Sequence, residues 1–152
     1  MIGNFSTFSE SFSSQTIDDN GIAFLGRWSF DTAPTGASFH TSQTQGDHAV
    51  ASFNGTSLKI SSCLHAHCLI SIPGTTFLLH GVTSPNSGNY TVTVDNVTTT
   101  LSAESSFTSY DSLLFYATGL DPGSTHFVQV SNSGGGNLSL LVGGFNTFAP
   151  FR

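Results

Sequence analysis

The sequence predicts an all-β fold, an antiparallel β-sandwich or jelly roll, on the strength of three observations. Short apolar or alternating runs recur about every 8–12 residues, which is the strand spacing of such folds. Gly, Pro and Asn cluster between many of the runs and supply turns. Helical periodicity is absent from any window longer than a turn or two.

Each predicted strand is a short run rich in apolar, aromatic or β-branched residues. In chain order these runs cover residues 22–28, 37–41, 48–53, 58–60, 68–72, 76–82, 90–94, 97–101, 113–116, 127–130 and 138–142. The clearest turn signals fall at 54–55, 73–74, 85–88 and 122–123.

Two of these elements carry more detailed predictions. Residues 90–94 alternate and place their apolar side chains on one face, and residues 97–101 return after a two-residue hairpin turn at Asp95 and Asn96. Residues 113–116 are continuously apolar, which predicts a strand buried on both faces.

Length and charge restrict the domain count and the partners. The chain has 152 residues, so we expect one domain over 1–152, with a core at about 15–143 between Phe-rich ends. Only three residues are basic and the net charge is −6, which excludes a nucleic-acid-binding surface. No apolar run is long enough to span a bilayer.

The cysteines and the Asn-x-Ser/Thr sequons point to the secretory pathway. Cys63 and Cys68 are spaced to close a small hairpin as a disulfide, with two reduced thiols as the alternative. The sequons lie at Asn4, Asn54, Asn89, Asn96 and Asn137. We therefore expect a secreted, extracellular glycoprotein.

Four segments together resemble a known β-sandwich domain of fungal secreted and surface proteins. They are IAFLGRW at 22–28, GDHAVASFNG at 46–55, FLLHGVTSPNSGNYTVTV at 77–94 and LLFYATGLDPGSTHFVQVSN at 113–132, and the likeness extends over about 15–143. The resemblance implies a galactose-binding-like jelly roll that binds carbohydrate or serves as an ectodomain module without catalysis. It transfers no binding residue, and the cysteine hairpin departs from the pattern.

Two places in the sequence carry candidate metal ligands. No cofactor is required, but galactose-binding-like domains often carry a structural calcium, and Asp18 and Asp19 are its candidate ligands here; an ordinary acidic turn is the alternative. We interpret His65 and His67, which lie between the cysteines, as the polar tip of a loop. Five residues are too few to place four ligands around a zinc ion. His126 is predicted to begin a strand and to pack or hydrogen-bond locally.

Sugar binding requires an exposed aromatic face with polar neighbours. Tyr110, in a predicted loop, is the aromatic expected to be exposed, and Asp111 and Ser109 beside it are suited to a sugar diol. Trp28 is the second aromatic candidate, with core packing as its alternative role. No nucleophile elbow or metalloprotease motif is present, so we expect no enzymatic activity.

Phenylalanines at spacings of three and four mark both ends, in segments without strand alternation. They are Phe5, Phe8, Phe12, Phe145, Phe148 and Phe151. Because exposed Phe side chains forgo burial, we expect both ends to dock, either on their own sandwich or, through the C-terminal tail, on a neighbouring subunit. Two functions are therefore expected as alternatives. The first is a carbohydrate-binding module at a cell wall or surface, with a glycan or cell-wall polysaccharide as partner. The second is a structural subunit that self-assembles into an oligomer or filament.

Overall fold

The computed structural model describes residues 12–17, 21–54, 75–121 and 123–150. The predicted strands at 58–60 and 68–72 lie outside these ranges.

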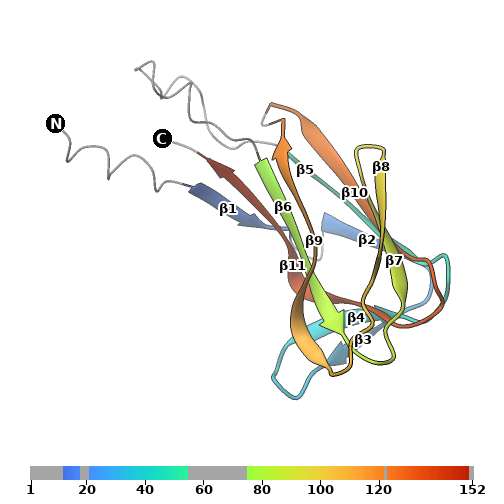
Figure 1. Cartoon of the computed structure of the whole chain (residues 1–152). Helices are drawn as coiled ribbons and strands as arrows, with labels where there is room; N and C mark the ends of the chain where they lie inside the picture. Colours follow the sequence, from blue (N-terminus) through green and yellow to red (C-terminus); the bar gives the residue numbers. More distant parts are fainter. Residues whose placement is uncertain (1–11, 18–20, 55–74, 122, 151–152) are drawn as a thin grey trace, which may run out of the picture.

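The described residues form eleven strands in two antiparallel sheets (Figure 1). Sheet A has the order β3-β4-β11-β6-β9, with β1 also paired to β11, and sheet B has the order β2-β5-β10-β7-β8. The strands are β1 (Phe12–Thr16), β2 (Ile22–Leu25), β3 (Trp28–Thr32), β4 (Ser38–Ser42), β5 (His48–Asn54), β6 (Thr75–Thr83), β7 (Asn89–Val94), β8 (Val97–Ser102), β9 (Ser109–Leu120), β10 (Thr125–Asn132) and β11 (Leu138–Pro150). The predicted antiparallel β-sandwich is confirmed.

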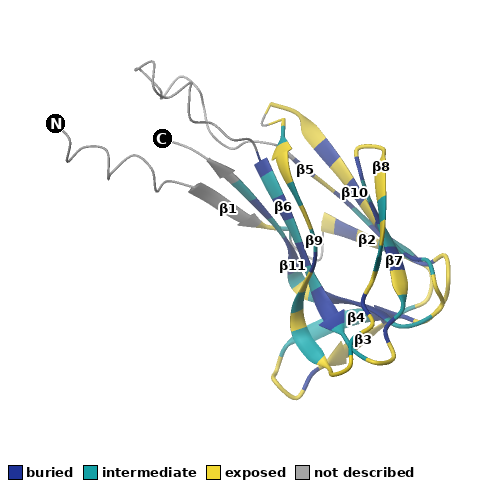
Figure 2. Cartoon of the chain, viewed as in Figure 1, coloured by how far each residue is buried: buried dark blue, intermediate teal, exposed yellow. Residues whose placement is uncertain are grey.

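The core lies between the two sheets and is built from their buried side chains. Figure 2 marks buried residues on strands of both sheets. Phe53 of sheet B stacks on Phe77 of sheet A with ring centroids 5.4 Å apart, and Phe77 also contacts Phe145 at 5.9 Å. Tyr90 crosses the core, and its hydroxyl donates a hydrogen bond to the carbonyl of Leu114. Burial raises the pKa of Tyr90 to about 12.

The described segments nearest to the two ends of the chain, β1 and the last part of β11, are strands, which the sequence did not predict. β1 pairs antiparallel with the end of β11, with Phe12 opposite Pro150 and Thr16 opposite Asn146. Backbone pairing between distant segments needs no apolar alternation in either one, which is why the pattern did not show it. Phe145 has no exposed surface and belongs to this chain's own core, as the first docking alternative expects, and Phe148 is half-buried.

Two strand predictions need correction. The predicted strand 22–28 divides into β2 and β3, which belong to different sheets, because the chain turns at Gly26 with φ of 111°. The run 113–116 is not buried on both faces: Leu113 and Tyr116 are 52% and 62% exposed. It lies in β9, the outermost strand of sheet A, where one face meets the core and the other meets solvent.

Gly26 is also the point where the backbone approaches a buried carboxylate. A Cβ atom at residue 26 would lie 2.0 Å from Oδ1 of Asp47. Oδ2 of Asp47 accepts a 2.7 Å hydrogen bond from the Ser42 hydroxyl. Glycine is therefore required here for both its backbone conformation and its lack of a side chain.

Candidate functional site

A hollow on the outer face of sheet B combines an exposed aromatic ring with several polar groups. Its volume is about 430 Å³. We call it the sheet hollow, and its lining residues are Val50, Thr93, Asp95, Asn96, Phe127, Val128 and Gln129.

Phe127 occupies this face because β10 alternates strictly. Val128 and Val130 are buried, whereas Phe127 is 63% exposed and Gln129 shares its outer face. Gln129 lies opposite Val50 on β5 and opposite Thr93 on β7, in the middle of the sheet. Beside the Phe127 ring, β10 itself therefore supplies the amide of Gln129, and the neighbouring strand β7 supplies the hydroxyl group of Thr93.

The β7–β8 hairpin turn supplies the two remaining polar groups. Asp95 and Asn96 have φ of 49° and 76°, the left-handed pair that a two-residue type I′ turn needs, so the predicted hairpin turn is confirmed. Asn and Asp adopt this conformation more readily than other side chains. The turn ends beside Phe127, because the Asp95 amide donates a 3.1 Å hydrogen bond to the Phe127 carbonyl.

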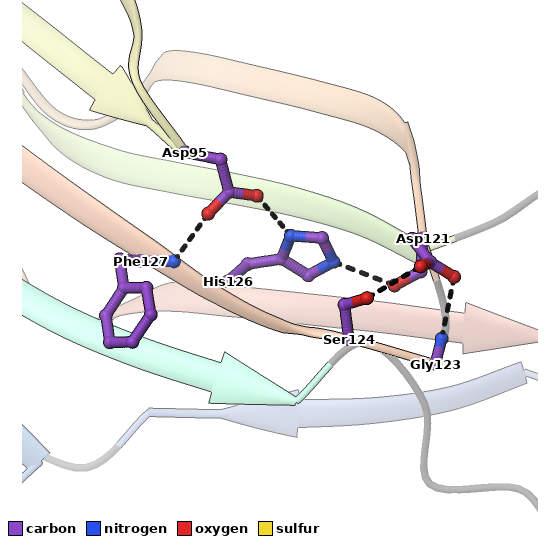
Figure 3. Close-up of polar contacts among 6 residues, drawn as sticks. All are labelled: Asp95, Asp121, Gly123, Ser124, His126 and Phe127. Atoms are coloured by element: carbon purple, nitrogen blue, oxygen red, sulfur yellow. Dashed lines mark hydrogen bonds and ion pairs between the residues drawn. The ribbon is translucent and has the colours of Figure 1, made fainter.

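The Asp95 carboxylate holds two consecutive residues of β10 (Figure 3). Its Oδ1 accepts a 2.9 Å hydrogen bond from the Phe127 amide, and its Oδ2 accepts one from Nδ1 of His126. Nε2 of His126 lies 2.8 Å from the carbonyl oxygen of Asp121. The turn, the strand and the chain entering β10 are thus tied together directly under the sheet hollow.

The surroundings of the buried His126 ring favour its doubly protonated, charged form. Both of its nitrogens face oxygen atoms that can only accept, a carboxylate and a backbone carbonyl, so both must donate. Burial opposes the charge, but the hydrogen bonds with Asp95 and Asp121 outweigh it and raise the pKa of His126 above its usual value. The ring also packs against Phe53 at a centroid distance of 5.4 Å.

The two carboxyl groups around His126 are both stabilised as anions. Burial works against ionisation of Asp95, but hydrogen bonds from His126 and Phe127 outweigh it and lower the pKa of Asp95. Hydrogen bonds from the Ser124 hydroxyl and the Gly123 amide lower the pKa of Asp121. The predicted local hydrogen bonding of His126 is confirmed for its contact with Asp121, whereas its second partner, Asp95, is 31 residues away in the sequence.

The sheet hollow has the chemistry of a recognition surface. Phe127 offers an apolar ring face, and the amide, hydroxyl and carboxylate groups around it can donate to or accept from hydroxyl groups. Asp95 is its one acidic lining residue, and no lining residue is basic. A pair of carboxyl groups facing each other, as glycoside hydrolysis requires, is not found among these lining residues.

Three of the sequence-predicted binding residues lie together elsewhere, at the start of β9. Tyr110 is in a strand and is half-buried, and its ring packs against Phe39 at 6.2 Å. Asp111 is exposed and lies in the same strand, with Oδ1 3.2 Å from Nδ1 of His80. Ser109 is half-buried opposite Thr83. The strand assignment of Tyr110 and its contact with Phe39 correct the expectation of an exposed loop aromatic.

Trp28 does not lie with Ser109, Tyr110 and Asp111. It lies opposite Ser42, two residues from His40, so it shares a face with His40 and not with Phe39. Its ring contacts Phe24 of sheet B at 5.3 Å, and its Nε1 donates a 3.0 Å hydrogen bond to the Leu25 carbonyl. The Trp28 side chain therefore packs between the two sheets, at one end of the sandwich.

The remaining sequence-predicted sites fall partly outside the described residues. These are Asn4, Phe5, Phe8, Asp18, Asp19, Cys63, His65, His67, Cys68, Phe151 and the side chains of Phe12 and Asn54. Of the other sequon residues, Asn89 and Asn96 are exposed and Asn137 is half-buried. Within the described ranges, no group of three or more metal-ligating side chains comes together. The same ranges contain no helix with the length and apolar character to cross a membrane.

The sequence analysis missed Phe127, although the signal was present. In the run Phe127-Val128-Gln129-Val130, the polar Gln129 has to face solvent while the valines face the core. Phe127 lies two residues before Gln129 and so shares its outer face. The alternation thus predicts an exposed aromatic in the middle of a sheet.

Comparison with known proteins supports the fold. No family model and no curated protein matches the sequence. Among solved structures, a CBM35 from Cellvibrio japonicus is 14% identical, with 92% of this chain and 95% of that chain covered, at a TM-score of 0.55. The Podospora anserina GH26-CBM35 β-(1,4)-mannanase is 12% identical, with 94% of this chain and 28% of that chain covered, at a TM-score of 0.55.

A family two carbohydrate esterase from Cellvibrio japonicus also matches, with 14% identity, 93% of this chain covered and a TM-score of 0.49. The chain spans 34% of the esterase and 28% of the mannanase. At 14% and 12% identity, the matches to the CBM35 and to the mannanase establish a shared β-sandwich fold alone, of the kind found in carbohydrate-binding modules.

Proposed function

We propose that the chain is a non-catalytic carbohydrate-binding module and that the sheet hollow is its ligand site. The observation that carries the proposal is Phe127, an aromatic ring 63% exposed in the middle of a sheet and flanked by hydrogen-bonding side chains. The shared fold with a CBM35 supports it, because that fold is used for sugar recognition in such modules.

The ligand chemistry follows from the lining. A pyranose ring has an apolar face that packs on an aromatic ring and hydroxyl groups at its edge that need polar partners. Gln129 and Thr93 lie beside Phe127 along the sheet, and Asp95 lies at its end, so both requirements are met on one surface. At about 430 Å³ the hollow falls within the size range of small-ligand sites.

Charge favours neutral glycans over acidic ones. The one ionised lining side chain is Asp95, whose pKa is lowered, and the protein carries a net charge of −6. A uronic acid or a sulfated sugar would find no basic side chain in the lining, and the nearby His126 is buried and already paired with Asp95. We therefore expect neutral oligosaccharides to bind and acidic ones to be rejected.

The proposal includes an extracellular location on or near a cell wall or surface. It is supported by the sequons, of which Asn89 is exposed on β7 and lies outside the lining of the sheet hollow. The disulfide between Cys63 and Cys68 and a structural calcium at Asp18 and Asp19 remain sequence-based parts of the same proposal.

Phe127→Ala is the direct test, measured by calorimetry with a neutral oligosaccharide selected on a glycan array. Loss of a central aromatic contact typically costs about 2 kcal/mol, so we expect Kd to rise roughly 30-fold. Phe107→Ala is the matched control, because Phe107 is also an exposed phenylalanine, at 68%, outside the sheet hollow. Its Kd should equal that of the wild type.

Two results would contradict the proposal. One is an array on which no neutral glycan is retained. The other is unchanged binding by Phe127→Ala with loss of binding by Tyr110→Ala, which would move the site to the start of β9.

A further inference from the structure

β8 is the last strand of sheet B and leaves one row of backbone groups without a partner among the described residues. It pairs only with β7, through the two-residue turn at Asp95 and Asn96. In such a hairpin the residues that flank the turn exchange both hydrogen bonds, and hydrogen-bonded pairs then recur at every second residue. The outward-facing amides and carbonyls are therefore those of Thr98, Thr100 and Ser102, which we call the β8 edge.

Proteins usually protect such edges, and β2, β3 and β9, the other end strands of the two sheet paths, show the usual devices. β2 has only four residues, and β3 carries the charge of Asp31. β9 carries Asp111, and its pairing with β6 shifts register at three places. Short length, charge and bulges all discourage pairing with another chain.

The β8 edge has none of these protections. Its six residues, VTTTLS, contain no charge, no proline and no glycine. All six pair with β7 in an unbroken register, from Val94 opposite Val97 to Asn89 opposite Ser102. A regular, uncharged strand rich in β-branched residues is well suited to accept another strand.

Exposed apolar side chains lie beside this edge. A groove of about 320 Å³ runs between β8 and β9, lined by Thr99, Leu101, Leu113, Leu114, Phe115 and Tyr116. At one end of β8, Val97 is 69% exposed, and Leu113 and Tyr116 are more than half exposed on the side of β9. Burial of these groups would add apolar contacts to backbone pairing.

We propose that a second copy of this chain pairs with the β8 edge in antiparallel register, centred on Thr100. Thr100 then lies opposite its own symmetry mate, and Thr98 lies opposite Ser102 of the second copy. All three outward residues of each chain fall in hydrogen-bonded pairs, which exchange two hydrogen bonds each. The two-fold axis makes the interface self-complementary and closed, so assembly stops at a dimer with a continuous ten-stranded sheet.

The charges that flank β8 are compatible with this register. Asp95 and Glu104 lie just outside the strand at its two ends. In the register centred on Thr100, Glu104 lies level with Asn96 of the second copy and Asp95 lies level with Ser105. No two carboxylates are directly opposite each other, so the most repulsive arrangement of these charges is avoided.

The test is the mass of the full-length protein in solution as a function of concentration, by sedimentation equilibrium. The wild type should approach twice its 16.0 kDa. Thr100→Lys places two lysines opposite each other on the axis and should weaken dimerisation by about tenfold or more. Thr32→Lys puts the same charge on an exposed position of β3 and should leave the dimer unchanged.

Two further measurements distinguish a loss of dimerisation from misfolding of the Thr100→Lys variant. Thr100→Val keeps the branched shape and the backbone amide, so it should dimerise like the wild type. Hydrogen exchange at the Thr98, Thr100 and Ser102 amides should slow as concentration rises, while exchange at Thr99 and Leu101 should not change. A wild type that is monomeric at every concentration, or a dimer that Thr100→Lys leaves intact, would overturn the proposal.

Discussion

Replacing Asp95 with Asn should remove a pH dependence of folding stability that the buried His126 ring creates. In the wild type, Asp95 and the Asp121 carbonyl accept hydrogen bonds from both ring nitrogens and raise the pKa of His126. A raised histidine pKa contributes stability that is fully present below the unfolded-state value of about 6.5. That contribution is lost as pH rises through the folded-state pKa.

Asparagine preserves the shape of this contact but not its charge. Its amide oxygen can still accept from Phe127, its NH₂ group can donate to Nδ1 of His126, and the left-handed φ of residue 95 suits Asn as well as Asp. The ring then needs only one proton, on Nε2, and stays neutral. The variant should therefore lack the loss of stability that the wild type shows above about pH 6.5.

The structure sets the size of the effect. A hydrogen bond between charged groups contributes about 1.5–3 kcal/mol, and the Asp95 side chain is 37% exposed, so solvent screening places this one near the lower limit. If the folded and unfolded states differ by one bound proton, the unfolding free energy changes by at most about 1.4 kcal/mol per pH unit. Because the pKa of Asp95 is itself lowered, the advantage of the wild type should also shrink in acid, as pH falls through that value.

Urea denaturation at several pH values between about 4 and 9 measures the difference in unfolding free energy between wild type and Asp95→Asn. Taking the difference cancels the titration of groups that both proteins share. The wild type should be the more stable by about 1.5 kcal/mol near pH 5 to 6, and by less at pH 9. A difference that is constant with pH would show that His126 does not carry the second proton.

Two stability measurements test the packing of the fold. Phe145→Ala should lower the unfolding free energy by about 3–5 kcal/mol, because its ring is fully buried against Phe77; a loss under about 1 kcal/mol would show that the C-terminal part of β11 does not belong to the core. Gly26→Ala should cost more than Gly36→Ala in the same denaturation assay. Both glycines have positive φ, but a Cβ at Gly36 meets nothing within 4 Å, whereas at Gly26 it would meet the Asp47 carboxylate, so equal losses would contradict the close approach.

Local patterns predicted most of the strands and the fold class. Alternation identified 90–94, and the Asp95-Asn96 pair identified the hairpin turn, because side-chain period and turn conformation depend on neighbouring residues alone. The pairing of β1 with β11 was missed because it joins segments more than 100 residues apart through their backbones. Such pairing leaves no periodic signature in either segment.

The candidate site shows the same limit. The exposure of its aromatic ring was predictable from alternation within β10, but the contact of Asp95 with this strand was not. Asp95 and His126 are 31 residues apart, and their contact depends on β7 and β10 being neighbours in sheet B. Tyr110 was chosen from its apparent loop context, which the long strand β9 replaces with a packed position against Phe39.

The sheet hollow and the β8 edge belong to the same sheet, and their geometry makes the two proposals compatible yet separable. A two-fold axis perpendicular to sheet B keeps the outer faces of both copies on one side, so a dimer would present two sheet hollows in the same direction. A polymeric glycan could then occupy both, and its apparent affinity would gain from that second contact. A soluble oligosaccharide that fills one hollow would gain nothing, because Phe127 lies on β10 and keeps its neighbours in the monomer. Binding of a short ligand therefore reports on Phe127 alone, and the mass in solution reports on Thr100 alone.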